Sequence, residues 1–231
     1  MKKTLIIIYF TLLLTPFLSA QKNETITVNA GMRVQDCITN VERYRYPDFT
    51  RGNVFYKNGA FSGANLNYNF LNAEMEFLQT RDTLSIANPA EIEFITIAND
   101  TFFYDNGYLE LIRNGQVKVA VKRYFKMNDV KKKDSYGNSG SLAATTAYSS
   151  LHTSGAYYKL MVNRDMVFEK ISEYCLAVSN EIFVPFNKKQ VMKLYPKKKE
   201  TIQDYLNSNK IDFHSKDDLL RFADYLSAFY D

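Results

Sequence analysis

The sequence predicts an α+β protein in which an antiparallel β-meander, forming a roll, sandwich or partial barrel, is followed by C-terminal helices. Three observations predict this class. Apolar and polar residues alternate through the middle of the chain, Asn-Gly pairs separate the alternating segments, and helical periodicity appears only in the tail. A chain of 231 residues is long enough for one or two domains.

Residues 1–20 have the pattern of a secretory signal peptide: a short basic start, an apolar run from Leu5 to Leu14, Pro16, and a small residue, Ala20, before Gln21. The alternative is an N-terminal membrane anchor, but the apolar run is shorter than the roughly 20 residues that span a bilayer. Because no cysteine follows Ala20, we expect neither a lipid anchor nor a transmembrane segment after cleavage.

The β-rich domain is expected over residues 21–126. In "NLNYNF", Leu66, Tyr68 and Phe70 alternate with three asparagines, as in a strand with one face in a core and one in water. "QVKVAVKRYFK" repeats the pattern with valines and lysines. We expect strands near 53–58, 61–70, 73–79, 84–87, 92–98, 101–105, 108–113 and 116–126.

The hairpin turns are expected at Asn58-Gly59, Asn106-Gly107 and Asn114-Gly115. Asn-Gly suits the type I′ turn, in which both central residues have positive φ. The first two pairs belong to a repeated pattern, "VFYKNG" and "TFFYDNG", of an aromatic pair, one charged residue and Asn-Gly. We interpret this repeat as turn chemistry rather than as a ligand-binding loop.

Residues 127–155 are rich in Ser, Gly, Thr and Asn, which is typical of a flexible linker or a long loop that covers a site. The region 156–231 then predicts two further strands, in "AYYKLMVN" and "EIFVPFN". The segment between them is compatible with a strand or a helix. Three helices are expected after it, in "NKKQVMKLYP", "KKETIQDYLNSNK" and "SKDDLLRFADYLSAFY".

The last predicted helix opens with Ser215 and Asp218 at the spacing of a capping box. Its apolar stripe contains Leu219, Phe222, Leu226 and Phe229. We expect the stripe to pack on the rest of the protein. The alternative is a face that binds a partner or a membrane, which makes Phe222 and Phe229 candidate binding residues.

Two cysteines, Cys37 and Cys175, form an even pair in a chain expected in an oxidising compartment. They are either joined in a disulfide or buried separately as thiols. Their spacing with the two histidines matches no zinc motif, and we expect no metal and no cofactor.

Loss of Lys2 and Lys3 with the signal peptide leaves 27 basic against 25 acidic residues. A nucleic-acid partner is therefore not expected, because phosphate binding needs a concentrated basic face. The one lysine-rich stretch, Lys188–Lys199, is interpreted as a solvated helix face. The tail supplies acidic residues that could balance it: Asp204, Asp212, Asp217, Asp218 and Asp224.

Several segments resemble a group of uncharacterised secreted proteins from Bacteroidota: "YPDFTRGNVFYKNG", "LNYNFLNAEMEF", "DTFFYDNGYLELI" and "NKKQVMKLYPKKKETIQDYLNSNKIDF". The resemblance covers most of residues 44–126 and 181–221. It implies a protein of a Gram-negative cell envelope, in the periplasm, at the outer membrane or outside the cell. It implies no functional residues.

Catalytic constellations are not evident. His152 and His214 are interpreted as surface-loop histidines, so a Ser-His-Asp triad is not expected. The paired carboxylates of Glu74 and Glu76, like those of Glu91 and Glu93, are expected to point outward from strands into water rather than to hydrolyse glycosides.

Tyr124, beside Lys122 and Lys126 on the polar face of a strand, is the better candidate for binding. We expect a non-enzymatic scaffold or binding module for another envelope protein. The alternative is a protein that binds a glycan or small ligand through exposed tyrosines, and a weaker one is a carboxylate hydrolase. A flat apolar patch would favour the first, an aromatic-lined groove the second and two convergent carboxylates the third.

Overall fold

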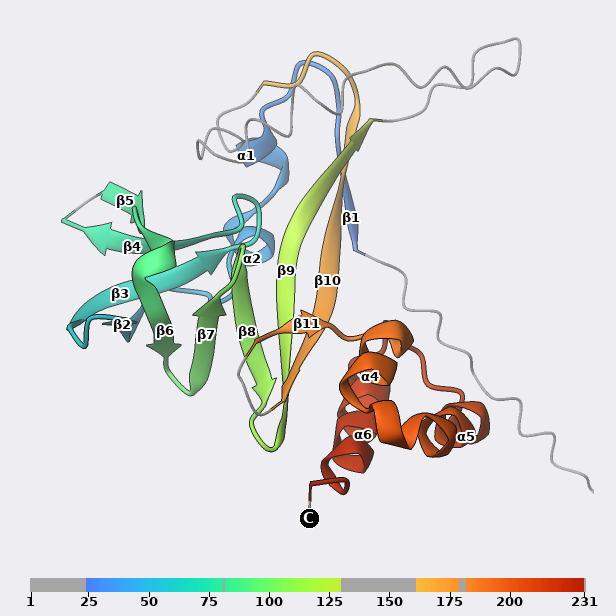
Figure 1. The fold of residues 1–231 in the computed structure, drawn as a ribbon. Helices are drawn as coiled ribbons and strands as arrows, with labels where there is room; N and C mark the ends of the chain where they lie inside the picture. The colour runs from blue at the N-terminus through green and yellow to red at the C-terminus, as the bar shows by residue number, and fades with distance from the viewer. Residues whose placement is uncertain (1–23, 81, 130–160, 179–181, 231) are drawn as a thin grey trace, which may run out of the picture.

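The computed structural model describes residues 24–80, 82–129, 161–178 and 182–230. One antiparallel sheet runs through the molecule in the order β1-β10-β9-β8-β7-β6-β2-β3-β4-β5, with β11 paired to β10, and three helices follow at the C-terminal end (Figure 1). The predicted α+β class is confirmed.

The eight strands expected between residues 53 and 126 are all present. They are β2 (Thr50–Tyr56), β3 (Phe61–Asn69), β4 (Glu74–Gln79), β5 (Asp82–Ser85), β6 (Ile92–Ile97), β7 (Asp100–Tyr104), β8 (Tyr108–Arg113) and β9 (Val117–Asp129), with a 3-10 turn η1 (Pro89–Glu91) before β6. In the sheet, β2 lies between β3 and β6. The chain therefore passes from β5 to β6 across β4, β3 and β2, and this connection is the one interruption of the meander between β2 and β9.

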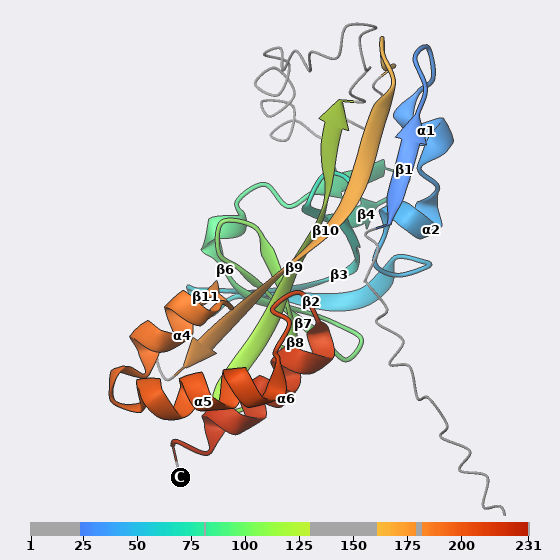
Figure 2. The ribbon, with the colours of Figure 1, turned by 90° about the vertical axis from the view of Figure 1, so that its right-hand side faces the viewer.

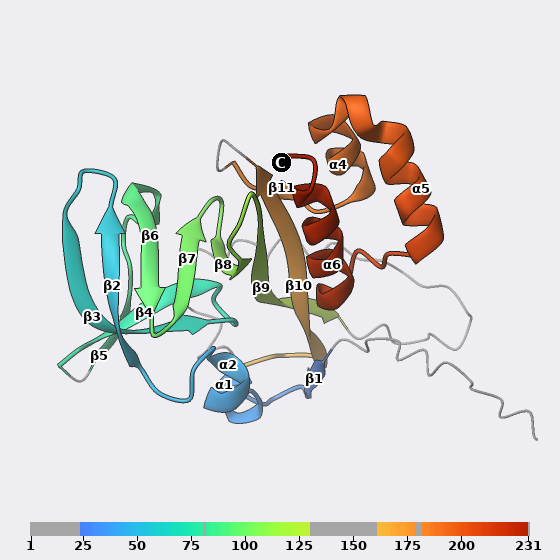
Figure 3. The same ribbon diagram turned by 90° about the horizontal axis from the view of Figure 1, so that it is seen from below.

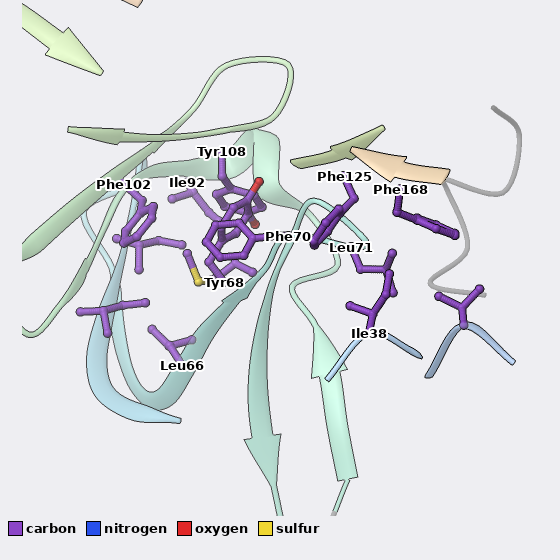
Figure 4. Packing of buried hydrophobic residues seen from close by; sticks show 14 of the residues in the cluster. Ile38, Leu66, Tyr68, Phe70, Leu71, Ile92, Phe102, Tyr108, Phe125 and Phe168 are labelled. Carbon is purple, nitrogen blue, oxygen red and sulfur yellow. The ribbon is translucent and has the colours of Figure 1, made fainter. Parts of the chain in front are cut away.

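The sheet curls until the end of β3 touches β9, although five places separate the two strands in the sheet order. The backbone N–H of Phe125 donates to the carbonyl of Phe70 at 2.9 Å, and the hydroxyl of Tyr68 donates to the carbonyl of Arg123 at 2.8 Å. The strands therefore form a partial barrel around an apolar core. Figure 4 shows Phe102, Leu66 and Tyr108 inside it.

Close strand packing in the barrel requires glycine at position 52. Gly52 is buried in β2, and a Cβ atom there would lie 2.4 Å from the carbonyl oxygen of Thr96 and 2.9 Å from Cδ1 of Leu66. Any side chain would push β2 away from β6.

Only one of the three Asn-Gly turns has the predicted conformation. Asn106 and Gly107 both have positive φ, 49° and 126°. At Asn58-Gly59 only the glycine does, because the hydrogen bond from the N–H of Tyr56 to the carbonyl of Ala60 closes a loop of three residues rather than two. At Asn114-Gly115 neither does, because a bulge after Leu111 lengthens that connection.

The N-terminal segment was not assigned from the sequence. It forms β1 (Thr25–Val28), α1 (Val34–Cys37) and α2 (Asn40–Arg43). The two helices are single turns that cover one end of the barrel core, and Ile38 between them is 1% exposed. Elements of one turn are too short to show a hydrophobic period, which explains why the pattern gave no signal.

β9 and β10 (Met166–Val178) pair along 13 residues and form the longest hairpin of the molecule. The segment that could have been strand or helix is thus a strand. The strands on either side of the expected linker, residues 127–155, are β9 and β10, and both belong to the same sheet. Residues 127–129 continue β9, and the rest of the expected linker lies outside the described residues, as does most of the strand expected in "AYYKLMVN".

The three expected C-terminal helices are α4 (Lys188–Leu194), α5 (Lys199–Asn209) and α6 (Lys216–Ser227), preceded by β11 (Val184–Pro185), with a 3-10 turn η4 (Pro196–Lys198) before α5. Asn187 and Ser215 cap α4 and α6 as predicted. The helices pack on the same hairpin face as the barrel core but at its other end, forming a helical core around Val119, Leu176 and Phe222. Figure 2 shows the hairpin running from β1 and α1 to these helices.

Candidate binding surface

Tyr124 and Lys122 lie on the outer face of β9, as predicted, but both are engaged within the chain. The hydroxyl of Tyr124 donates to Glu173 at 2.8 Å, and Nζ of Lys122 donates to the carbonyl of Asn106 at 2.7 Å. Burial, with the Glu173 carboxylate, raises the pKa of Tyr124 to about 12, which keeps the phenol neutral. Lys126 is exposed beside them.

Phe222 is not a surface residue. It is 0% exposed and stacks between Phe186 and Tyr205, with ring centroids 5.8 and 5.6 Å away. The proposal of Phe222 as a binding residue is therefore wrong, because the stripe of α6 faces the helical core. Phe229 is half-buried, packs on Tyr225 at 5.2 Å and also serves this core.

Cys37 and Cys175 are free thiols, so the disulfide that the sequence left open is not formed. Cys37 lies in α1, which packs against β1 near Met166. Cys175 lies nine residues along β10 from Met166, about 30 Å at the usual rise per residue. A disulfide needs Cα atoms within about 7 Å.

Glu76 is buried, contrary to the expectation that it points into water. It is 4% exposed and accepts hydrogen bonds from the hydroxyl of Tyr44 and from Nδ2 of Asn69, both at 2.7 Å, and Arg43 lies 3.6 Å from it. Asn67 and Asn69 are buried too, because residues 43–46 run beside the end of β3. Glu91 and Glu93 are exposed as expected.

A second polar network, the Arg45 network, consists of Arg45, Tyr46, Asp100, Glu110 and Arg123. Glu110, 6% exposed, accepts hydrogen bonds from both arginines, and Asp100 accepts from Arg45 at 3.2 Å and from the hydroxyl of Tyr46 at 2.6 Å. Burial and the Asp100 carboxylate raise the pKa of Tyr46. Each carboxylate is held by donors from the chain, so we interpret the network as structural.

The outer faces of β3, β2, β6 and β7 carry a row of phenylalanines. We name Phe61, Phe55, Phe94 and Phe103 the phenylalanine row. Phe55 pairs with Phe61 on one side and with Phe94 on the other, and the register that pairs Ile95 with Phe102 places Phe103 next to Phe94. Each residue comes from a different strand, and these strands lie side by side in Figure 3.

Phe61 is the most exposed member of the row. It is 70% exposed, whereas Phe55, Phe94 and Phe103 are half-buried. Phe183, from the segment before β11, extends the row with its ring 5.5 Å from that of Phe103, and the neighbouring Ile182 is 61% exposed. Together these side chains expose on the order of 300 Å² of apolar surface, which is the size of patches that often bind a partner.

The ring of Phe55 is stacked between those of Phe61 and Phe94. The centroids of Phe55 and Phe94 are 4.5 Å apart with an interplanar angle of 23°, and those of Phe55 and Phe61 are 6.0 Å apart at 28°. Rings this close and this nearly parallel must be stacked, since rings side by side in one plane would overlap. Both faces of the Phe55 ring are therefore covered by its neighbours.

A polar strip borders the phenylalanine row. The same strands place Gly63, Asn53 and Thr96 one step further along the sheet, paired in register. Arg51 reaches over Gly63, where a Cβ atom would lie 2.7 Å from its Nη2. The surface thus combines a narrow apolar row with hydrogen-bonding groups along one side.

His214 is an exposed loop residue, as expected, and its ring lies 3.3 Å from Asp212; His152 lies outside the described residues. Among the residues that the structure describes, no three His, Cys, Asp or Glu side chains are grouped so that they could hold a metal ion. Nor does any helix in this part of the chain have the length and apolar character needed to cross a membrane. Comparisons of the chain with protein-family models, curated proteins and solved structures found no match.

The phenylalanine row is brought together by the register of four strands, not by a local sequence motif. Phe55 belongs to the repeated pattern "VFYKNG", but the alternation that places it outside also places Val54 in the core. An apolar residue at an outward position in each of four adjacent strands is the signal that could have found the surface.

Proposed function

We propose that this chain is an exported, non-enzymatic binding protein of the bacterial cell envelope, which holds an apolar segment of another envelope protein on its phenylalanine row. The secretory pattern at the N-terminus and the resemblance to secreted proteins support the location. The single observation that carries the function is the stack of Phe61, Phe55 and Phe94 on an outer sheet face.

The shape of the surface favours one extended or helical segment as the partner. The row is one residue wide and crosses four strands, about 15 Å at the usual strand spacing. A stable interface between globular proteins buries about 800 Å² on each side, more than twice what the row exposes. A single amphipathic segment needs less area, and the polar strip can bond its backbone or polar side chains.

A glycan is the less favoured ligand. Sugars pack their C–H faces against flat aromatic faces, whereas the faces of the Phe55 ring are covered by Phe61 and Phe94, and phenylalanine has no hydroxyl group to bond a sugar. Tyr124, the candidate for glycan binding, already donates its hydroxyl to Glu173.

The test is site-specific photo-crosslinking in the native envelope. A benzophenone amino acid replaces Phe61 in one variant and Leu84 in another; Leu84 is also an exposed apolar strand residue, at 41%, but lies on the edge strand β5. We expect a discrete adduct with one envelope protein from position 61 and none from position 84. Adding Phe94→Ser to the first variant should reduce the adduct, because it breaks the stack.

Equal adducts from positions 61 and 84 would contradict the proposal, as would an adduct that Phe94→Ser leaves unchanged. An adduct of twice the chain mass would identify a second copy as the occupant instead. If position 61 gives no protein adduct, and soluble envelope glycans shield its benzophenone from photoreaction, the glycan alternative would replace the proposal.

A further inference from the structure

Six lysines lie within twelve consecutive residues, where α4, η4 and α5 follow one another. We name Lys188, Lys189, Lys193, Lys197, Lys198 and Lys199 the lysine patch. All six are exposed. Within the same stretch, residues 188–200, the only acidic residue is Glu200. This patch is separate from the phenylalanine row and does not depend on the function proposed for it.

In the described residues, the acidic residues of the tail form no direct ion pair with the lysine patch. Asp224 pairs with Arg113 at 2.7 Å, and Asp218 pairs with Arg221. Within the described parts of the chain no ion pair includes a lysine of the patch; Lys198 lies over the ring of Phe229 at 5.4 Å. The expected balance between basic stretch and acidic tail is therefore not present as direct pairs.

The lysines also stand where they do not favour helix formation. Lys188 and Lys189 are the first two residues of α4, and Lys199 is the first residue of α5. The N-terminal turn of a helix carries a partial positive charge, so a cation there is unfavourable. Local stability thus gives no reason for three lysines at these positions, and charges placed against a local preference are expected where they serve binding.

The occupant of the patch is a surface rather than a small anion. A hollow of about 400 Å³ between α4 and α5 is lined by Lys188 and Lys199, but also by Glu200 and Asp204, which would repel an anion inside it. The other four lysines of the patch are exposed and do not line the hollow. An extended array of negative charges can contact them without entering it.

Three features favour a membrane surface over a nucleic acid. The patch is made of lysines alone, which attract phosphate as point charges without reading geometry. The helices that carry it lie at the end of the molecule opposite β5 in Figures 1 and 3. Tyr230, 41% exposed and with its ring 5.7 Å from that of Tyr195, adds an aromatic residue of the kind found at membrane interfaces.

We propose that the lysine patch docks the exported protein on the phosphate-bearing, anionic phospholipid surface of an envelope membrane. The attraction is electrostatic and reversible, at about 1 kcal/mol for each lysine near the surface. It concentrates the protein at the membrane while the phenylalanine row, on another part of the molecule, stays accessible.

The test is sedimentation of the exported form of the chain with vesicles of phosphatidylcholine, with and without phosphatidylglycerol. We expect binding only to the anionic vesicles, with an affinity that falls as salt is raised. The triple variant Lys189→Gln, Lys193→Gln, Lys197→Gln should bind roughly a hundredfold more weakly. A control with the same change in charge, Lys126→Gln, Lys210→Gln, Lys216→Gln, should bind within a few-fold of the parent chain.

Equal loss in the two triple variants would overturn the proposal, since net charge rather than the patch would then cause binding. Equal binding to vesicles without phosphatidylglycerol would overturn it as well. If duplex DNA or heparin binds in solution while the anionic vesicles do not, the patch recognises a soluble polyanion and the membrane assignment is wrong. Circular dichroism and thermal unfolding of both variants exclude misfolding as the cause.

Discussion

Arg45 donates two hydrogen bonds to Glu110, from Nε to Oε2 at 3.1 Å and from Nη2 to Oε1 at 3.0 Å. The two residues come from distant parts of the sequence, the segment before β2 and the middle of β8. Their paired geometry fixes the segment across one end of the barrel, where it also pairs with the end of β3. This ion pair, named the clamp here, therefore holds the segment before β2 against β8 and stabilises the curvature of the sheet.

Replacing Glu110 with alanine should destabilise the fold by about 3 kcal/mol, because two arginines lose a buried carboxylate and keep their charges. Urea unfolding followed by circular dichroism measures the change. Glu93→Ala is the matched control on the exposed face of β6 and should change stability by less than about 0.5 kcal/mol. Equal effects at the two positions would show that the clamp contributes little.

The variants Phe222→Ala and Phe61→Ala should differ in stability, because one residue lies in the helical core and the other on the surface. Phe222 is fully buried in the helical core, so its truncation should cost about 3–5 kcal/mol. Phe61 is 70% exposed, and its loss should cost well under 1 kcal/mol. Thermal unfolding compares the two variants; a larger loss for Phe61→Ala would contradict the placement of the row.

Cys175 should react slowly with alkylating reagents at neutral pH. Burial, with the Glu173 carboxylate, raises its pKa from 9.0 to about 11, so the thiolate fraction at pH 8 is about a hundredfold lower than for an unperturbed thiol. In a Cys37→Ser variant, the iodoacetamide rate should rise roughly ninefold between pH 9 and 10 in the folded chain but less than about twofold in urea. A rise of less than about twofold in both states would contradict the burial.

The same raised pKa links Cys175 to stability. The folded state favours the neutral thiol, so this contribution is complete below pH 9 and is lost as the pH rises through about 11. The difference in unfolding free energy between the parent chain and Cys175→Ala should therefore shrink over this interval. Urea unfolding at a series of pH values measures it, and a difference independent of pH would exclude the linkage.

Lys199→Glu should stabilise the protein. It replaces an unfavourable cation at the first residue of α5 with an anion, a change of about 0.3–1 kcal/mol in favour of folding at low salt. Lys210→Glu, at the other end of α5, should have the opposite or no effect. A drop in melting temperature for Lys199→Glu would show that the lysine serves stability, which would weaken the argument for membrane docking.

The strands between residues 50 and 129 were predictable because each depends on local alternation and each connects to its neighbour through a short turn. The predicted exposure of Asn67 and Asn69, however, was wrong. Their pattern predicted exposure, but residues 43–46 and the buried carboxylate of Glu76 satisfy their amides away from water. A single strand does not show which distant segment will cover it.

The candidate surface was less predictable than the fold for a related reason. Phe222 was proposed as a binding residue because an apolar stripe has the same sequence pattern whether it packs on a core or stays exposed. Phe55 and Phe61 were not proposed together, because only the register between β2 and β3 makes them neighbours. The Cys37–Cys175 question likewise depended on the length of β10, which the ambiguous pattern of residues 166–175 left undefined.

Under the export proposed above, the pairing of β1 with β10 sets an order of events. Residues 25–28 would leave the membrane among the first of the chain, and their partners, residues 166–169, only after most of it. Until then the strand has no edge to join, and the apolar end of the barrel that α1 and α2 cover remains open. Any factor that holds newly exported chains should therefore find its binding site at the N-terminus, and should release it when β10 arrives.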